Sequence, residues 1–130
     1  MTAPIRPRPA YSLDPDWRGQ IRAALQHKSH LDTRSIFHEL NPHLKDSPIV
    51  PPGTKMRPAA VLFPIIERAA LPTVLFTVRS KEMPSHAGQI SFPGGRLHAD
   101  DPTAIAAALR ETEEEVNIPP HAVNVIGSLG

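Results

Sequence analysis

The clearest hydrophobic periodicity of the chain lies between residues 103 and 116. Apolar or small side chains recur there at three- and four-residue intervals: Ile105, Ala108, Leu109, Thr112 and Val116. This spacing is typical of one face of a helix, and the segment is rich in alanine and lacks glycine. Asp101-Pro102 is typical of a helix start, and Asn117 before Pro119-Pro120 of a helix end. We therefore predict a helix over 103–116 that packs one face on a sheet.

Shorter apolar runs predict strands. Four runs are apolar and in part β-branched: residues 59–67, 73–78, 89–92 and 122–126. We expect the first two to pair with each other, with Pro64 at an edge position or a bulge. The third leads into Pro93-Gly94-Gly95, where we expect a sharp turn, and the fourth is the last strand. Strands before and after a long helix indicate an α/β fold class.

The first 57 residues have a different character. More than half of the sixteen prolines lie at or before Pro58. Asp14-Pro15 and the apolar spacing that follows predict a short amphipathic helix to about residue 27. A second short helix over 32–40 and a linker over 47–53 are also expected. We divide the chain into an N-terminal Pro-rich and helical extension, 1–57, and an α/β domain, 58–130.

Composition narrows the classes of protein. The formal net charge is +1, so nothing global indicates nucleic acid or an anionic membrane as a partner. The absence of cysteine excludes disulfides, thiolate zinc sites and cysteine nucleophiles. No apolar run approaches the ~20 residues of a membrane-spanning helix, and the N-terminus lacks the apolar core of a secretion signal. The sequence predicts a cytoplasmic protein and allows a homodimer.

The predicted helix carries a dense group of carboxylates. Four glutamates fall within five residues: Glu111, Glu113, Glu114 and Glu115. At roughly 100° per residue, Glu111, Glu114 and Glu115 share one face, while Glu113 points away. Like charges at this spacing destabilise a helix by about 0.2–0.5 kcal/mol per pair. Two interpretations remain open on the helix alone: a solvated acidic face, or a site where a cation removes the repulsion.

The neighbours of these glutamates bear on that choice. Mg²⁺ and Mn²⁺ suit oxygen ligands, and metal-assisted attack of water on a phosphoanhydride is the chemistry this suggests. Arg110 is adjacent and could orient one glutamate. Gly94 and Gly95 have no side chains, so their backbone could approach a metal or a phosphate closely.

The glycine turn and the helix together resemble the Nudix box, in which a glycine and a loop precede REUxEExGU on a helix. Gly95 is followed by RETEEE at 110–115, with a spacing one residue longer than in the commonest form. This spacing and the segment LFTVRSKEMPSHAGQISFPGG at 75–95 resemble the coenzyme A pyrophosphatase branch, with its LLTxRS-type strand and GxxxFPGG turn. The matching positions are Leu75, Phe76, Thr77, Arg79 and Ser80, and then Gly88, Ile90, Phe92, Pro93, Gly94 and Gly95. The resemblance covers roughly residues 58–127.

The resemblance implies a Nudix-type mixed β-sheet with the box helix packed on it, after an N-terminal helical segment. It implies an enzyme that uses Mg²⁺ or Mn²⁺ to cleave the pyrophosphate linkage of coenzyme A or acyl-CoA to 3′,5′-ADP and a 4′-phosphopantetheine product. The alternatives are a Nudix hydrolase of another nucleoside diphosphate derivative, such as ADP-ribose or a nucleotide sugar, and a truncated, inactive nucleotide-binding fragment. Relatives continue beyond the last predicted strand, so we expect the C-terminal part of the fold to be missing.

The resemblance also assigns residues. Glu111, Glu114 and Glu115 are the implied metal ligands. The implied catalytic residues are Glu111, the candidate general base, Glu114, and Arg110, which holds a carboxylate in place. Substrate contacts are expected from Arg79, Ser80, His86, Gln89, Gly94 and Gly95. Arg79 is expected at the substrate's phosphates or its 3′-phosphoadenosine end. The chain departs from the branch at Pro84, where arginine is frequent, and at Asn117, which replaces the box glycine.

Overall fold

The computed structural model describes residues 13–26, 39, 42–44, 51–82, 84 and 87–129. The chain divides into two compact units, residues 1–32 with 126–130 and residues 33–125. The helix predicted over 32–40 lies outside the described residues except for Glu39, and most of the linker predicted over 47–53 lies outside them too. In the described part of the chain, no helix is long and apolar enough to cross a membrane.

The first unit contains α1, which spans Trp17–Gln26 where the sequence predicts a helix. Its start is fixed by Asp14, whose carboxylate accepts a hydrogen bond from the Asp16 backbone N–H at 2.8 Å. The Asp14 carbonyl accepts a second one from the Trp17 N–H at 3.0 Å. The predicted helix start at Asp14-Pro15 therefore has the hydrogen bonds of an N-cap. In the same unit Gly127 lies close to Leu25, since a Cβ on this glycine would be 2.6 Å from Leu25 Cδ1.

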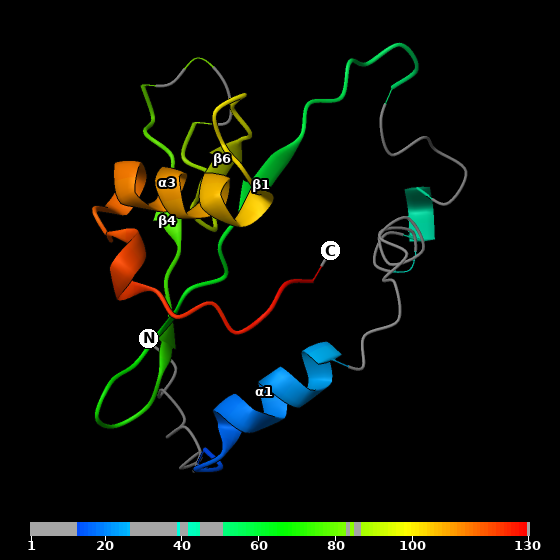
Figure 1. The fold of residues 1–130 in the computed structure, drawn as a ribbon. Coiled ribbons are helices and arrows are strands. Elements are labelled where there is room, and N and C mark those ends of the chain that lie inside the picture. The colour runs from blue at the N-terminus through cyan, green and yellow to red at the C-terminus, as the bar shows by residue number, and fades with distance from the viewer. Residues whose placement is uncertain are drawn as a thin grey trace, which may run out of the picture. The chain divides into compact units, whose positions relative to one another are not determined.

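Within its described residues, the second unit contains three short antiparallel strand pairs and the helix α3 (Figure 1). The pairs are β1 (Ala59–Val61) with β6 (Gly94–Arg96), β2 (Ile65–Ile66) with β3 (Thr73–Val74), and β4 (Thr77–Val78) with β5 (Ile90–Ser91). A short 3₁₀ helix, η1, spans Pro42–Leu44. The predicted pairing of 59–67 with 73–78 is confirmed for β2 and β3, which Leu75 extends by donating to the Pro64 carbonyl at 3.1 Å. The first part of 59–67 pairs elsewhere, with β6.

The predicted turn at the glycine pair is wrong, because residues 94–96 form a strand. Gly95 is paired with Ala60 and Gly94 with Val61. A Cβ on Gly94 would lie 2.5 Å from Val61 Cα, closer than van der Waals contact allows. Consecutive glycines indicate a turn locally, but here they permit close approach of two backbones.

α3 spans Ala104–Val116 and lies across β1 and β6 (Figure 1). The helix prediction is confirmed, but its N-cap is Thr103, whose hydroxyl accepts from the Ala106 N–H at 3.1 Å. Asp101, the predicted cap, has other partners. Asn117 ends the helix, as predicted, and adopts the left-handed conformation at φ 57°, ψ 35°, with its N–H donating to the Glu113 carbonyl.

Small side chains allow α3 to approach the strands closely. Ala107, Ala108 and Thr112 are buried, and the Thr112 hydroxyl donates to the Ala108 carbonyl at 2.7 Å. Ile105, a member of the predicted apolar stripe, remains 46% exposed, whereas Ala107, which was not part of that stripe, is buried. Alanines on a helix leave room for backbone-to-backbone packing, and this sets the distance between α3 and the glycine strand.

The predicted last strand, 122–126, is also wrong. Pro120–Ala122 form a short 3₁₀ helix, η2, and residues 123–129 have no regular structure. Proline has a fixed φ and no N–H, so Pro120 suits the first position of a helical turn. The Val123 N–H closes this turn by donating to the Pro120 carbonyl at 3.1 Å. The two prolines thus favour a turn before the β-branched residues can extend.

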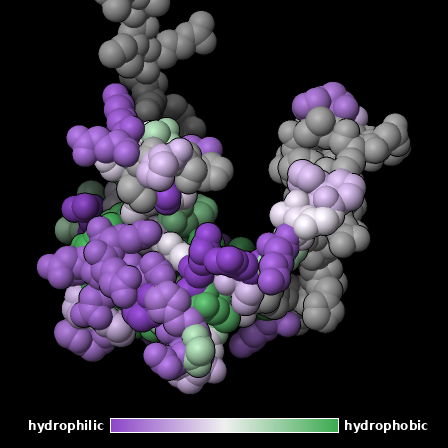
Figure 2. All heavy atoms as spheres, turned by 90° about the horizontal axis from the view of Figure 1, so that it is seen from above, coloured by the Kyte–Doolittle hydropathy of each residue, from purple (hydrophilic) through white to green (hydrophobic). Residues whose placement is uncertain are grey.

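Three phenylalanines from the segments between the strands pack together. The Phe92 ring lies 4.8 Å from Phe63 and 4.8 Å from Phe76, measured between centroids. Phe63 and Phe76 nevertheless remain about half exposed. Figure 2 shows one face of the molecule, on which hydrophobic residues appear in patches between hydrophilic ones.

Candidate active site

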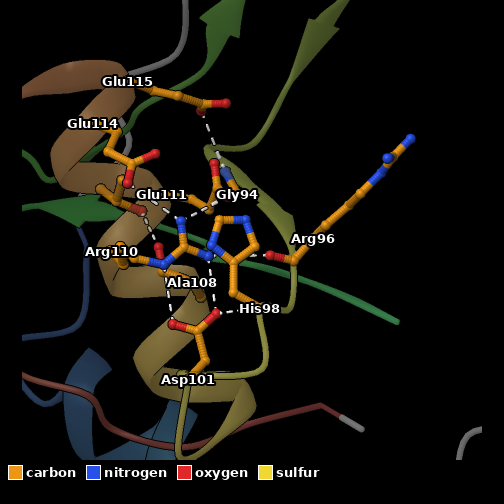
Figure 3. Close-up of polar contacts among 10 residues, drawn as sticks. Gly94, Arg96, His98, Asp101, Ala108, Arg110, Glu111, Glu114 and Glu115 are labelled. Carbon is orange, nitrogen blue, oxygen red and sulfur yellow. Dashed lines mark hydrogen bonds and ion pairs between the residues drawn. The ribbon is translucent and has the colours of Figure 1, made fainter. Parts of the chain in front are cut away.

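The carboxylates of Glu111 and Glu115 on α3 lie against the glycine strand β6 (Figure 3). A Cβ placed on Gly95 would lie 2.5 Å from Glu111 Cδ and 2.7 Å from Glu111 Oε2. A side chain at this position would therefore displace the Glu111 carboxylate from its place against β6. The Gly94 N–H donates to Glu115 Oε2 at 3.3 Å. Two of the three predicted metal ligands therefore contact the glycine pair: Glu111 approaches Gly95 closely, and Glu115 accepts a hydrogen bond from Gly94.

Arg110 joins the remaining polar groups of the site. Its Nε donates to Asp101 Oδ1 at 3.0 Å and its Nη2 to Asp101 Oδ2 at 2.9 Å, which is a bidentate pair. Nη2 also donates to the Arg96 carbonyl at 3.1 Å. Nη1 donates to Glu111 Oε1 at 2.9 Å and to Glu114 Oε1 at 3.3 Å. The arginine links the loop before α3, the end of β6 and two glutamates.

Asp101 is a member of this site that sequence reasoning missed. Its hydrogen bonds with Arg110, and a further one from the His98 backbone N–H, lower the pKa of its carboxyl from 3.8 to about 2. The same pairing with Asp101, together with Glu111, raises the pKa of Arg110. The signal that could have identified Asp101 is Thr103, a second capping residue two positions later that leaves the aspartate free for another partner.

The four glutamates divide as the helical geometry predicts. Glu113 is exposed, and no side-chain hydrogen bond is found for it within the described part of the chain. Glu111 is the most enclosed of the site carboxylates on α3, with 16% of its side chain exposed, whereas 59% of the Glu114 side chain is exposed. One carboxylate thus lies deep against β6, and another lies at the solvent edge of the same site.

A cation is the ligand that this donor set could hold. Among the described residues, no group of three or more histidine, aspartate or glutamate side chains is arranged so that it could hold a metal ion as it stands. Arg110 and Gly94 instead occupy one oxygen of each glutamate: Glu111 Oε1, Glu114 Oε1 and Glu115 Oε2. Their second oxygens accept no hydrogen bond in the described part of the chain. Carboxylate oxygens on one helix, beside a backbone with no Cβ, fit a hard cation such as Mg²⁺ or Mn²⁺.

The predicted substrate residues of the β4–β5 hairpin form a separate group. The Arg79 N–H donates to the Gln89 carbonyl at 2.8 Å, and the Arg79 carbonyl accepts from the Gly88 N–H at 2.9 Å. Ser80 Oγ accepts from the Glu82 N–H at 3.3 Å. Arg79, Ser80 and Gln89 therefore lie together where the hairpin opens into its loop. His86 lies outside the described residues.

Comparisons with known proteins agree with this geometry. Residues 55–130 match the model of the NUDIX domain. The chain is 49% identical over 98 residues to "Uncharacterized Nudix hydrolase NudL" of Shigella flexneri serotype 5b, covering 75% of this chain and 48% of that protein. It is 54% identical over 86 residues to the protein of the same name from Klebsiella aerogenes, covering 66% of this chain and 70% of that protein.

A third relative, from Escherichia coli K12, has the same name and is 59% identical over 73 residues. The match covers 56% of this chain and 38% of the Escherichia coli protein. The chain thus spans about half or less of the length of several curated relatives that it matches.

Proposed function

The chain belongs to the Nudix family, and from this membership we propose that it carries the carboxylate site of a divalent-metal-dependent hydrolase that cleaves a pyrophosphate linkage. The observation that carries the proposal is the set of glutamates on α3 that Arg110 and Gly94 hold opposite the glycine strand. A solvated acidic face would need neither the arginine nor the glycines. The CoA pyrophosphatase activity below is proposed for the whole protein.

The proposed mechanism gives the glutamates of the site different roles. Glu111, Glu114 and Glu115 would hold the cation. When bound, Mg²⁺ or Mn²⁺ supplies charge neutralisation at phosphate oxygens and lowers the pKa of water. Glu111 is the candidate general base because it is the most enclosed of these carboxylates and Arg110 fixes the position of its carboxylate. Glu114, which shares the same Arg110 nitrogen, is the second catalytic carboxylate.

The substrate that we propose is coenzyme A or an acyl-CoA, cleaved to 3′,5′-ADP and a 4′-phosphopantetheine product. Support comes from the resemblance of residues 75–95 to the CoA pyrophosphatase branch and from the position of Arg79 and Ser80 together at the open end of the hairpin. A guanidinium suits a phosphate group. The backbone of Gly94 and Gly95 lies beside the Glu111 and Glu115 carboxylates, and we propose that it contacts a substrate phosphate there.

The cellular setting that we propose is the cytoplasm, with a small-molecule substrate and no nucleic-acid or membrane partner. A chain without cysteine and with a net charge of +1 supports this. A homodimer is compatible with the same composition.

The experiment is a product assay on the purified protein with Mn²⁺ and CoA, following 3′,5′-ADP by chromatography. Wild type is expected to release 3′,5′-ADP, and Glu111→Gln to lower kcat by about 10²-fold or more, since general-base catalysis contributes about 10²–10⁴. Glu113→Gln is the matched control: it removes the same charge from the exposed side of the same helix and should retain the wild-type rate.

Three outcomes would count against the proposal. Equal rates for the two variants would refute the role of Glu111. Faster hydrolysis of ADP-ribose than of CoA would refute the substrate. No hydrolysis of either compound by folded wild type would refute the enzymatic function of this chain.

A further inference from the structure

We propose that Asp101 is a positioning residue that keeps the guanidinium of Arg110 from occupying the cation site. This inference rests on the proposed cation site. Asp101 itself touches none of the three glutamates through a hydrogen bond in the described part of the chain; its partners are Arg110 and the His98 N–H (Figure 3). Its influence on the site therefore passes through the arginine.

The distribution of the arginine's donors supports this role. A guanidinium offers five N–H groups in a planar fork. The Nε edge of the fork grips both oxygens of Asp101, and Nη2 also reaches the Arg96 carbonyl. Only Nη1 is left for the glutamates, and it touches one oxygen of Glu111 and one of Glu114. The second oxygen of each remains available to a cation.

The position of Asp101 is itself well determined. Its Oδ2 accepts from the His98 backbone N–H at 2.7 Å, so the loop between β6 and α3 holds the carboxylate in place. Only 7% of the Asp101 side chain and 26% of the Arg110 side chain are exposed. Partly buried charges are screened much less by salt than exposed ones, so the grip should persist at ordinary ionic strength.

Loss of the Asp101 charge would release the fork. A guanidinium matches a carboxylate bidentately, and the nearest remaining carboxylates are Glu111 and Glu114, at 2.9 and 3.3 Å from Nη1. Turned towards them, the arginine would cover oxygens that a cation needs and place a positive charge beside it. Asp101→Asn should therefore weaken cation binding because Arg110 competes, and it should have no such effect where Arg110 is absent.

The experiment measures the Mn²⁺ dissociation constant by electron paramagnetic resonance for four proteins: wild type, Asp101→Asn, Arg110→Gln and the double variant. We expect Asp101→Asn to weaken binding about 10- to 100-fold, the range usual for partners that orient ligands. The double variant should bind within about twofold of Arg110→Gln, because the competing fork is gone. Asp101→Glu, which keeps the charge and its two oxygens, should bind more tightly than Asp101→Asn and serves if Asp101→Asn does not fold.

The outcomes separate this inference from the proposed function. Equal weakening by Asp101→Asn in both backgrounds would mean that Asp101 acts as a general negative charge or a structural support, and would overturn the inference alone. Wild-type affinity in Asp101→Asn would do the same. If folded wild type binds no Mn²⁺, the cation site fails, and the proposed function and the inference fall together.

Discussion

At the scale of single residues, Arg110 offsets part of the negative charge of the site. Arg110 contacts three carboxylates, those of Asp101, Glu111 and Glu114, within 3.3 Å. Without a cation, the glutamates repel each other, and the arginine offsets part of that cost. It reaches only one oxygen of Glu111 and one of Glu114, so the second oxygen of each glutamate is left for a bound cation.

The Asp101 pair predicts a dependence of stability on pH. The pKa of Asp101 is lowered from 3.8 to about 2, chiefly by the Arg110 hydrogen bonds, so the pair stabilises the fold above about pH 4. This stabilisation is lost as the pH falls from 4 towards 2, because the unfolded state then takes up the proton first. Urea unfolding of wild type and Asp101→Asn should show wild type more stable at pH 6, with the difference shrinking below pH 4.

Comparing the two proteins cancels the titration of the carboxylates that do not contact Arg110. A difference between wild type and Asp101→Asn that stays constant from pH 6 to pH 2.5 would contradict the lowered pKa.

How far the site could be predicted from sequence depends on the range of each contact. The shared face of Glu111, Glu114 and Glu115 follows from helical geometry, which is local. The pairing of Asp101 with Arg110 joins a loop to a helix nine residues on, and the local pattern favoured a cap for that aspartate instead. The close approach of Gly95 to Glu111 depends on how α3 docks, which no local pattern contains.

At the scale of elements, the helix was predictable and the strands were less so. In α3 the apolar spacing continues along the helix, most residues are good helix formers and both ends have capping residues, so all three signals predict the same helix. The strands have only two or three residues each. β1 pairs with β6, from which it is separated by four other strands in the sequence, so the expected pairing with the next apolar run was wrong for β1. The run 122–126 is β-branched, yet it has no strand partner in the described residues and follows two prolines.

The N-cap of α3 gives a prediction at this scale. Thr103→Ala removes the acceptor of the Ala106 N–H and should lower the free energy of unfolding by about 1 kcal/mol. Thr103→Ser keeps the hydroxyl and should stay close to wild type. Chemical unfolding followed by circular dichroism measures both. If Thr103→Ala is as stable as Thr103→Ser, the capping bond contributes nothing to α3.

At the scale of the whole molecule, the docking of α3 on β1 and β6 creates the site (Figure 1). Buried Ala107 and Ala108 bring the helix close, and the glycine strand leaves room for the Glu111 carboxylate. Of the elements that carry the family resemblance, α3 and β6 make these contacts. The matched region, residues 55–130, includes α3, β6 and the β4–β5 hairpin.

The central claim is that Glu111, Glu114 and Glu115 form a cation site and not a solvated acidic face, and Mn²⁺ titration of three proteins tests it most directly. Wild type should bind Mn²⁺, Glu114→Gln should bind it at least about tenfold more weakly, and Glu113→Gln should stay within about twofold of wild type. Glu113 and Glu114 are adjacent on α3 and both exposed, so the two variants change the total charge equally. Equal affinities for Glu113→Gln and Glu114→Gln would contradict the claim.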